Sequence, residues 1–233
     1  MSGKRGGDED ALREEGKRRA DALREEYHRA GDPFGWFEAC YRSAGGEAGL
    51  VPWGHEMARP ELGQWLERLP PERRRGRALD IACGLGDNAA QLARAGFDVT
   101  AFDIAPTAVE WASKRFPGLG IGWRQADLLD LPAEFSGAFD LVNETYTIQA
   151  IRPPQRERAI ALLPGLVAPG GTLLVIARAR HDDEPENPPP WPLLKRELEP
   201  ILDAGLKEVC FEDFISERKG RGIRHFRAEY RRG

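Results

Sequence analysis

The chain has 233 residues and a formal net charge of −4, with 41% hydrophobic and 31% charged residues. These values are ordinary for a globular domain with a full hydrophobic core. The acidic balance argues against nucleic acid as the main partner, because phosphate binding needs an excess of basic side chains on one face. Since no stretch approaches the roughly 18 apolar residues of a membrane span, we also expect no membrane partner.

The N-terminal residues and the cysteines indicate a cytoplasmic location. Residues 1–10, MSGKRGGDED, lack the apolar stretch of a secretory signal, and we expect them to form a disordered tail. Cys40, Cys83 and Cys210 are odd in number and lie far apart, so they form no metal or disulfide pattern. We expect the reducing cytoplasm and no metal site, and the sequence predicts no particular oligomeric state.

Residues 11–30 are dense in Glu, Arg and Ala. Pairs of opposite charge such as Glu14 and Arg18 lie four residues apart, which favours an exposed helix. This helix is either a solvated surface element or a lid over the functional site.

A glycine-rich segment with several aromatic side chains follows at 32–54. Its aromatic residues are Phe34, Trp36, Phe37, Tyr41 and Trp53. An amphipathic helix is predicted over 56–69, because leucines recur on one side of it.

From residue 78 onward, short apolar runs alternate with helical stretches. The predicted strands are 78–82, 98–103, 121–125, 138–143 and 171–178. The predicted helices are 87–95, 106–115, 154–168 and 193–203. The alternation predicts a parallel sheet with helices on both faces.

The C-terminal part differs from this pattern. Residues 206–214 and 223–231 are predicted strands, and since no helix separates them the pair should be antiparallel. Residues 182–194, DDEPENPPPWPLL, hold too much proline for a helix or an interior strand. The predicted fold class is therefore α/β: a Rossmann-like, doubly wound, mostly parallel seven-stranded sheet with an antiparallel C-terminal strand.

The run LDIACGLGDNAAQLARAG, residues 79–96, passes from a strand through a glycine turn into a helix. Gly84 and Gly86 let the backbone approach a ligand at the carboxyl end of the sheet, where open α/β folds bind ligands. Asp103 ends the second strand, where its carboxylate can accept both hydroxyls of a ribose. These features fit a dinucleotide as well as S-adenosylmethionine.

Two further acids favour S-adenosylmethionine. Asp80 precedes the glycines, and a carboxylate there suits a free ammonium group and would repel a pyrophosphate. Asp127 ends the third strand, where it can accept from an adenine amino group. Each acid taken singly also fits a turn or a helix cap, but three acids at the ends of successive strands favour one shared ligand.

Four runs carry a family resemblance: ALDIACGLGDNAAQLARAGFDVTAFDIAPTAVEWA, ADLLDLP, FDLVNETYTIQAI and LLPGLVAPGGTLLVIAR. In this order, over roughly 78 to 178, they resemble the class I S-adenosylmethionine-dependent methyltransferases. The segments PPPWPLLKRELEPIL and FEDFISERKGRGIRHFRAEYRR, with the aromatic N-terminal segment, resemble the thiopurine S-methyltransferase-like branch. That branch methylates small molecules, often at sulfur. From the charge pattern we expect a charged tail and helix at 1–30, and from the resemblance a single methyltransferase domain over 31–233.

The resemblance also implies a set of cofactor-binding residues, to which Asp80 is added from its charge and Gly86 from its place in the glycine turn. They are Trp36, Trp53, Asp80, Ala82, Cys83, Gly84, Gly86, Asp103, Ile104, Asp127, Leu128, Asn143 and Thr145. Within this set, the turn at 82–84 holds the methionine part, Asp103 and Ile104 the ribose and adenine, and Asp127 and Leu128 the adenine edge. Ala82 departs from the family, which commonly has glycine at that place.

Methyl transfer is an in-line displacement, so positioning supplies most of the barrier reduction. Glu144 and Tyr146 follow the fourth strand directly and are the candidate catalytic residues, although Glu144 also suits a role in orienting a ligand. A thiol, with a pKa of about 8.5, needs no dedicated base, whereas a phenol gains from one. Because no constellation demands oxygen chemistry, we predict a small-molecule acceptor with a thiol or another soft nucleophile. An oxygen or nitrogen acceptor, a binding module without chemistry and, less favoured, a nicotinamide dehydrogenase are the alternatives.

The predicted walls of the acceptor pocket are mainly aromatic. They are Phe37, Tyr41, Trp53, His55, Tyr146 and Trp191. Trp191 lies in the rigid sequence PPPWP, which suits a lid over the acceptor.

Overall fold

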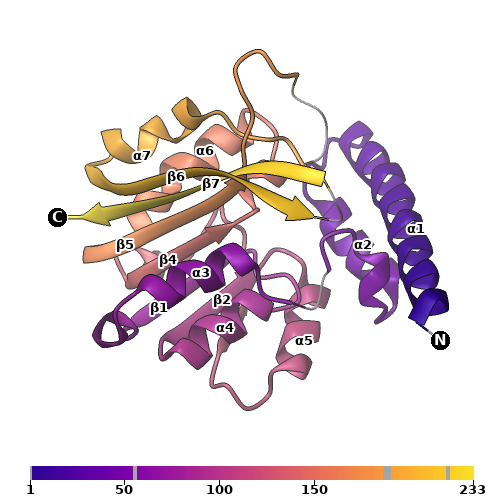
Figure 1. Cartoon of the computed structure of the whole chain (residues 1–233), viewed down its shortest axis with the longest axis horizontal. Coiled ribbons are helices and arrows are strands. Elements are labelled where there is room, and N and C mark those ends of the chain that lie inside the picture. Colours follow the sequence, from indigo (N-terminus) through magenta and orange to yellow (C-terminus); the bar gives the residue numbers. More distant parts are fainter. Residues whose placement is uncertain (1, 55–56, 186–189, 219–220) are drawn as a thin grey trace.

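The computed structural model describes residues 2–54, 57–185, 190–218 and 221–233. Seven strands form one sheet in the order β3-β2-β1-β4-β5-β7-β6, shown in Figure 1. The strands are β1 (Arg77–Ile81), β2 (Asp98–Asp103), β3 (Gly122–Gln125), β4 (Phe139–Thr145), β5 (Val167–Arg178), β6 (Leu206–Arg218) and β7 (Arg221–Arg232).

The strand directions confirm the predicted fold class. Strands β1 to β5 pair in parallel, whereas β7 pairs antiparallel with both β5 and β6. Strands β6 and β7 pair along their length as far as residues 218 and 221, so no crossover helix separates them. The hairpin places β7 between β5 and β6, which makes β7 the strand that runs against the rest.

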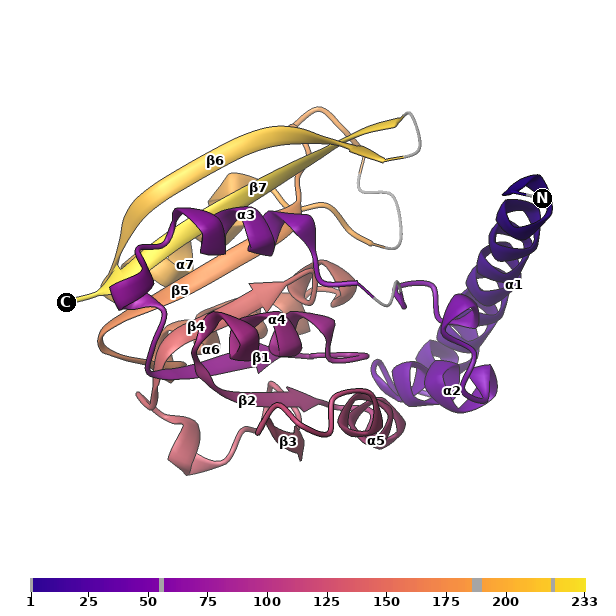
Figure 2. The same cartoon turned by 60° about the horizontal axis from the view of Figure 1, so that its bottom comes forward.

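Helices cover both faces of the sheet, as Figure 2 shows for α3 and α4 on one face and α6 and α7 on the other. The helices are α1 (Ser2–Arg29), α2 (Gly35–Ala44), α3 (Pro60–Arg68), α4 (Asp87–Ala95), α5 (Pro106–Arg115), α6 (Gln155–Leu162) and α7 (Glu199–Asp203). Short 3-10 turns are η1 (Ala48–Leu50), η2 (Pro71–Arg73), η3 (Ala133–Phe135), η4 (Ile148–Ala150), η5 (Leu163–Leu166) and η6 (Lys195–Leu198).

The core consists of two main clusters, one on each face of the sheet, because side chains alternate between the faces along each strand. In β1, Ala78 packs with the α3 and α4 layer while its neighbour Leu79 packs with the α6 and α7 layer. Leu174 and Val175 in β5 divide in the same way. Because successive side chains of a strand point to opposite faces, each apolar run serves two cores at once.

Helices α4 and α5 begin and end at the predicted residues. Gly96, with φ of 112°, ends α4 in the left-handed conformation, and its N–H bonds back to Ala93. Pro106 begins α5, where its missing N–H is not needed. Local signals of this kind set both boundaries.

Other predicted helices are shorter than expected. The helix expected over 154–168 ends at Leu162, because Pro164 and Gly165 favour the turn η5 and β5 already begins at Val167. The region 193–203 is divided into η6 and α7. The helix expected over 56–69 is α3, and residues 55–56 lie outside the described residues.

The expectation of a disordered tail is wrong for residues 2–10, because α1 is continuous from Ser2 to Arg29. Arg18 and Arg19 pair with Glu15 one turn away, which stabilises the middle of the helix. Each residue added to an existing helix gains one hydrogen bond, so extension toward Ser2 costs less than starting a new helix. Helix α1 packs on α2 and η1, and the two helices lie together at one side of the molecule in Figures 1 and 2. Gly16 allows this contact, because a Cβ there would lie 2.4 Å from the carbonyl oxygen of Leu50.

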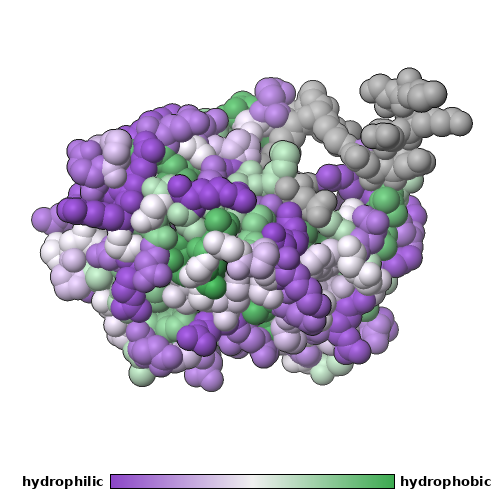
Figure 3. All heavy atoms as spheres, turned by 90° about the horizontal axis from the view of Figure 1, so that it is seen from below, coloured by the Kyte–Doolittle hydropathy of each residue, from purple (hydrophilic) through white to green (hydrophobic). Residues whose placement is uncertain are grey.

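The surface is mixed in character. On the face shown in Figure 3, hydrophobic residues gather toward the middle and hydrophilic residues predominate around them. Within the described residues, every helix is too short or too polar to cross a membrane.

Candidate functional site

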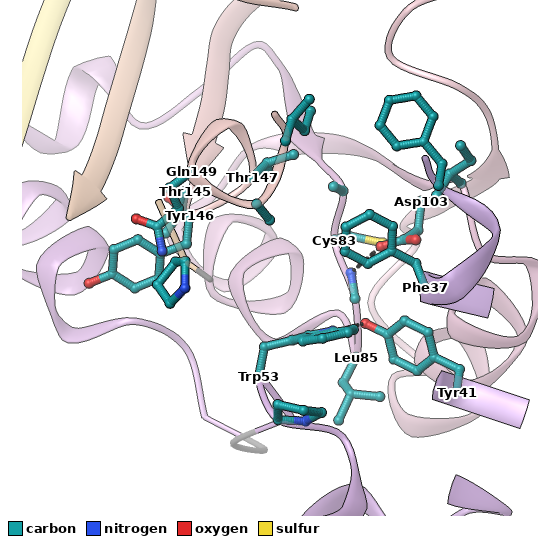
Figure 4. Close-up of a pocket in the computed structure, with 18 of the residues that line it drawn as sticks. Phe37, Tyr41, Trp53, Cys83, Leu85, Asp103, Thr145, Tyr146, Thr147 and Gln149 are labelled. Atoms are coloured by element: carbon teal, nitrogen blue, oxygen red, sulfur yellow. Dashed lines mark hydrogen bonds between the residues drawn. The ribbon is translucent and has the colours of Figure 1, made fainter. Parts of the chain in front are cut away.

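A pocket lies at the carboxyl ends of β1, β2 and β4, between the sheet and helices α1 and α2. Figure 4 shows Thr145, Tyr146 and Gln149 on one side and Phe37 and Asp103 on the other. The pocket therefore has two ends: a β2–β3 end, where Asp103 lies, and a β4–β5 end, where Tyr146 lies.

The glycine turn after β1 forms the floor of the pocket. The N–H of Cys83 donates to the carbonyl of Phe102 at 2.8 Å, and the N–H of Gly84 donates to Oδ2 of Asp103 at 2.9 Å. Both bonds tie the turn to the end of β2. Gly84 has φ of 54°, and Ala82 has φ of 48°, which is a costly conformation for a residue with a Cβ.

Asp103 lies at the β2–β3 end of the pocket with 5% of its surface exposed. Its Oδ1 accepts the N–H of Ala105 at 2.9 Å, in addition to the bond from Gly84 to Oδ2. Burial raises its pKa to about 6, while the bonds from backbone N–H groups oppose that shift. Each carboxylate oxygen keeps a further lone pair, so Asp103 can still accept hydrogen bonds from a ligand in the pocket.

Three other predicted residues surround the β2–β3 end: Ile104, Asp127 and Leu128 all line the pocket. Asp127 also closes a turn, because its Oδ1 accepts the N–H of Leu129 at 2.8 Å. The two roles suggested by the sequence, turn residue and ligand contact, are thus compatible at one position.

Asp80 and Asn143 lie beneath the pocket and do not line it. Both are buried, with 1% and 0% of their surface exposed. Nδ2 of Asn143 donates to Oδ1 of Asp80 at 2.7 Å, and the hydroxyl of Thr145 donates to Oδ1 of Asn143 at 3.0 Å. Burial raises the pKa of Asp80 to about 7. The structure therefore connects Asp80 to the pocket through Asn143 and Thr145, of which Thr145 is the lining residue.

Glu144 is also buried and does not line the pocket. Its Oε1 accepts the N–H groups of Thr147 at 2.7 Å and Ile148 at 3.0 Å, so it holds the turn that follows β4. Burial raises its pKa to about 7. Glu144 therefore holds the turn after β4, whereas the sequence suggested that it acts in catalysis or orients a ligand directly.

Tyr146, the second candidate catalytic residue, does line the pocket. It has φ of 67°, and its N–H donates to the carbonyl of Ile176 at 2.9 Å. The guanidinium of Arg59 lies 5.0 Å from the centre of its ring. Unfavourable backbone conformations persist only where the surroundings fix them, and they gather at functional sites.

An aromatic wall closes the pocket from the N-terminal side. The indole N–H of Trp53 donates to the hydroxyl of Tyr41 at 2.6 Å, as drawn in Figure 4. Trp36 stacks on Phe37 with 4.1 Å between ring centres, and both rings meet Trp53 edge-on. All four predicted residues line the pocket. Aromatic faces stabilise a nearby cation, which suits a sulfonium ligand.

Some predicted residues lie elsewhere. Trp191 is 4% exposed and does not line the pocket. The guanidinium of Arg152 covers the Trp191 ring, and the backbone N–H of Trp191 donates to the carbonyl of Gln149. Pro190 lines the pocket in its place. Gly86 is the residue before α4 and does not line the pocket, and His55 lies outside the described residues.

The sequence reasoning missed several basic lining residues. They are Lys17, Arg24, Arg59 and Arg178. Arg178 ends β5, so the rule that ligands bind at strand ends could have found it. Lys17 and Arg24 belong to α1, whose charges resemble those of any solvated helix.

Comparisons with known proteins fit this geometry. Residues 78–171 match the methyltransferase domain family. An uncharacterized methyltransferase of Mycobacterium tuberculosis is 39% identical over 98 residues, which is 42% of this chain and 48% of the relative. Trans-aconitate 2-methyltransferase of Deinococcus radiodurans is 32% identical over 128 residues, which is 54% of this chain and 46% of the relative. The chain thus spans about half the length of the curated relatives it matches.

Solved structures support the fold. The 1,6-didemethyltoxoflavin-N1-methyltransferase of Burkholderia thailandensis, solved with its substrate and S-adenosylhomocysteine, has a TM-score of 0.64 at 19% identity. The match covers 84% of this chain and 86% of that one. Residues 78–171 therefore resemble the methyltransferase domain family and the chain shares the fold of a solved methyltransferase, which supports the predicted class I S-adenosylmethionine-dependent methyltransferase. The thiopurine S-methyltransferase-like branch is not established by these relatives and stays a prediction.

Proposed function

We propose that the protein transfers the methyl group of S-adenosylmethionine to a small molecule. One observation carries the proposal: the buried carboxylate of Asp103 is fixed by the N–H groups of Gly84 and Ala105 at the β2–β3 end of a pocket that the aromatic wall closes. In a methyltransferase domain, this is a fitted acceptor for a ribose beside a surface suited to a sulfonium. The described Burkholderia structure contains S-adenosylhomocysteine, which supports the choice of cofactor.

The lining residues fit that cofactor. In this proposal Asp103 holds the ribose, while Ile104, Asp127 and Leu128 surround the adenine. The turn at 82–84 and Thr145 hold the methionine part, and Asp80 and Asn143 support Thr145 from below. When bound, S-adenosylmethionine supplies an electrophilic methyl group.

The residues of the chain act by positioning the acceptor. Glu144 holds the turn after β4 and thereby fixes Tyr146 and Thr147 at the β4–β5 end. Trp53 and Phe37 line the space between the two ends and in this proposal shield the reacting groups from water. Because Glu144 is bonded to backbone N–H groups, we propose that the acceptor loses its proton to solvent, which favours a thiol or another soft nucleophile.

An acceptor oxygen is the second candidate. One specific observation favours it: the Deinococcus relative is named for methylation of trans-aconitate, a carboxylate compound. A carboxylate is ionised at neutral pH and, like a thiolate, needs no base. The division of the chain at residue 30 and the cytoplasmic location remain part of the proposal.

The test is transfer of labelled methyl from S-adenosylmethionine to a panel of thiols, phenols, amines and carboxylates. We expect labelled product and S-adenosylhomocysteine with at least one class, and a rate with thiols that rises with pH below the thiol pKa. Phenol methylation without thiol or carboxylate methylation would overturn the preferred nucleophile. A folded protein that binds the cofactor and methylates nothing across broader panels would favour the binding module.

A further inference from the structure

The charges of the pocket are divided between its two ends. At the β2–β3 end the acids are Asp103 and Asp127, and the nearby Asp87 is neutralised by two hydrogen bonds from Arg115 at 2.7 and 3.0 Å. The remaining described lining residues of the Asp, Glu, Lys and Arg types are Lys17, Asp21, Arg24, Arg59 and Arg178. When the two acids assigned to the cofactor and the paired Asp87 are set aside, four basic side chains and one acid remain among the described lining residues.

Two of the arginines line the pocket near its β4–β5 end, and one of them lies over the ring of Tyr146. Arg59 is placed over the Tyr146 ring, its Nη2 donates to the carbonyl of Trp53 at 3.3 Å, and its backbone N–H donates to Asn88 at 2.9 Å. Arg178 ends β5, two residues after Ile176, whose carbonyl accepts the N–H of Tyr146. The backbone of both arginines is fixed, and both side chains are half-buried.

The backbone of Arg178 is held by another lining residue. Its N–H donates to Oε1 of Gln149 at 2.6 Å, and Gln149 is itself 5% exposed. Gln149 belongs to η4, the turn that Glu144 holds. The same turn that fixes Tyr146 therefore also fixes Arg178 at the β4–β5 end.

Helix α1 adds basic groups from the opposite wall. The side chain of Arg24 is 13% exposed, although its salt-bridge partner Asp21 is 42% exposed. The guanidinium thus lies on the inner side of the pair, and Lys17 lies two turns earlier on the same helix. Basic groups from α1, β5 and the segment before α3 line one pocket.

We infer that the methyl acceptor carries a carboxylate, which binds at the β4–β5 end through Arg59 and Arg178. The inference deepens the proposed function and rests on it, because a cationic sulfonium donor is assumed beside the aromatic wall. Guanidinium groups recognise carboxylates through paired hydrogen bonds, and they do so best when partly withdrawn from water. A cationic acceptor would meet repulsion from both the arginines and the sulfonium, whereas an anionic acceptor is attracted by both.

The test uses simple probes with the S-adenosylhomocysteine complex, so that turnover is not required. Benzoate and phenylacetate are titrated by calorimetry and compared with their neutral isosteres, benzamide and phenylacetamide. We expect each carboxylate to bind at least about tenfold tighter than its amide, with an affinity that falls as salt is added. Inorganic phosphate is a further arm and is expected to compete weakly, because the inference assigns a planar carboxylate.

Variants assign the effect to residues. Arg178→Gln and Arg59→Gln should each weaken carboxylate binding about tenfold and leave amide binding unchanged. Arg180→Gln removes the same charge two residues from Arg178 at a side chain that does not line this pocket, so carboxylate affinity should be retained. Affinity for S-adenosylhomocysteine should be the same in all three proteins.

The outcomes separate the two proposals. Equal binding of carboxylates and amides, or no saturable carboxylate binding at millimolar concentrations, overturns the inference while leaving the proposed function in place. Carboxylate binding that survives both arginine variants, or tighter binding of phosphate than of carboxylate, also overturns it. A protein that does not bind S-adenosylhomocysteine contradicts the proposed function itself, and that is measured before any probe is added.

Discussion

At the scale of single residues, Asp103 connects the fold to the proposed chemistry. Its two oxygens bond Gly84 and Ala105, and it lines the pocket beside Ile104. The place of Asp103 in the pocket could be predicted from the sequence, because a carboxylate at the end of a parallel strand lies at the edge of the sheet where ligands bind. The role of Glu144 could not be predicted in the same way, because the direction of its side chain depends on the turn that it holds.

Replacing Asp103 by Ala should weaken binding of S-adenosylhomocysteine by about 3 kcal/mol, roughly a hundredfold, because two charge-assisted bonds are lost. Calorimetry measures this directly. Asp98→Ala, at the exposed opposite end of β2, is the control and should bind normally. Unchanged affinity in a folded Asp103→Ala protein would mean that the ribose is held elsewhere.

Ala82 has φ of 48°, where an alanine is disfavoured by about 1–2 kcal/mol. Ala82→Gly should raise the free energy of unfolding by about 0.5–1 kcal/mol, since the greater freedom of glycine in the unfolded chain offsets part of the gain. Denaturant unfolding provides the measurement. Ala105→Gly, at a buried residue with φ of −84°, should instead destabilise the protein. A destabilised Ala82→Gly protein would show that this conformation is not strained.

At the scale of elements, local signals explain which boundaries could be predicted. Helix α5 begins at a proline and α4 ends at a glycine in the left-handed conformation, so both of these boundaries could be predicted from the sequence. The helix predicted over 154–168 wrongly included the turn η5, because the apolar pattern of the sequence continues through Pro164. The place of α1 against the pocket depends on the fit of Gly16 against Leu50, a tertiary contact without a sequence pattern.

Gly16→Ala should displace α1, because the added Cβ would lie 2.4 Å from a backbone oxygen that cannot move freely. We expect faster proteolysis within residues 1–30 and weaker benzoate binding, with affinity for S-adenosylhomocysteine largely kept. Gly118→Ala places a methyl group in open space and is the matched control. Identical proteolysis of the two variants would argue against the close packing of α1.

At the scale of the whole molecule, three buried carboxyl groups lie in or beneath one site. The pKa values of Asp80, Asp103 and Glu144 are raised by burial from 3.8, 3.8 and 4.5 to about 7, 6 and 7. Each group binds its proton more tightly in the folded state, so its contribution to stability is present at low pH and is lost as pH rises through the folded pKa.

This linkage predicts the behaviour of Asp80→Asn. Because wild type loses the contribution of Asp80 between about pH 4 and 7, the free energy of unfolding of the variant should rise relative to wild type over that range. Denaturant unfolding of both proteins at several pH values measures the difference. Asp98→Asn, at an exposed residue, is the control and should differ from wild type by a constant amount. A flat difference for Asp80→Asn would show that folding does not raise the pKa of Asp80.

The central claim is that this pocket binds S-adenosylmethionine with its acidic β2–β3 end and its aromatic wall. Calorimetric titration of the ligand-free protein with S-adenosylmethionine, S-adenosylhomocysteine and NAD tests it most directly. We predict saturable binding of both sulfur compounds at one site per chain and no response to NAD. Binding of NAD without binding of S-adenosylhomocysteine would contradict the account.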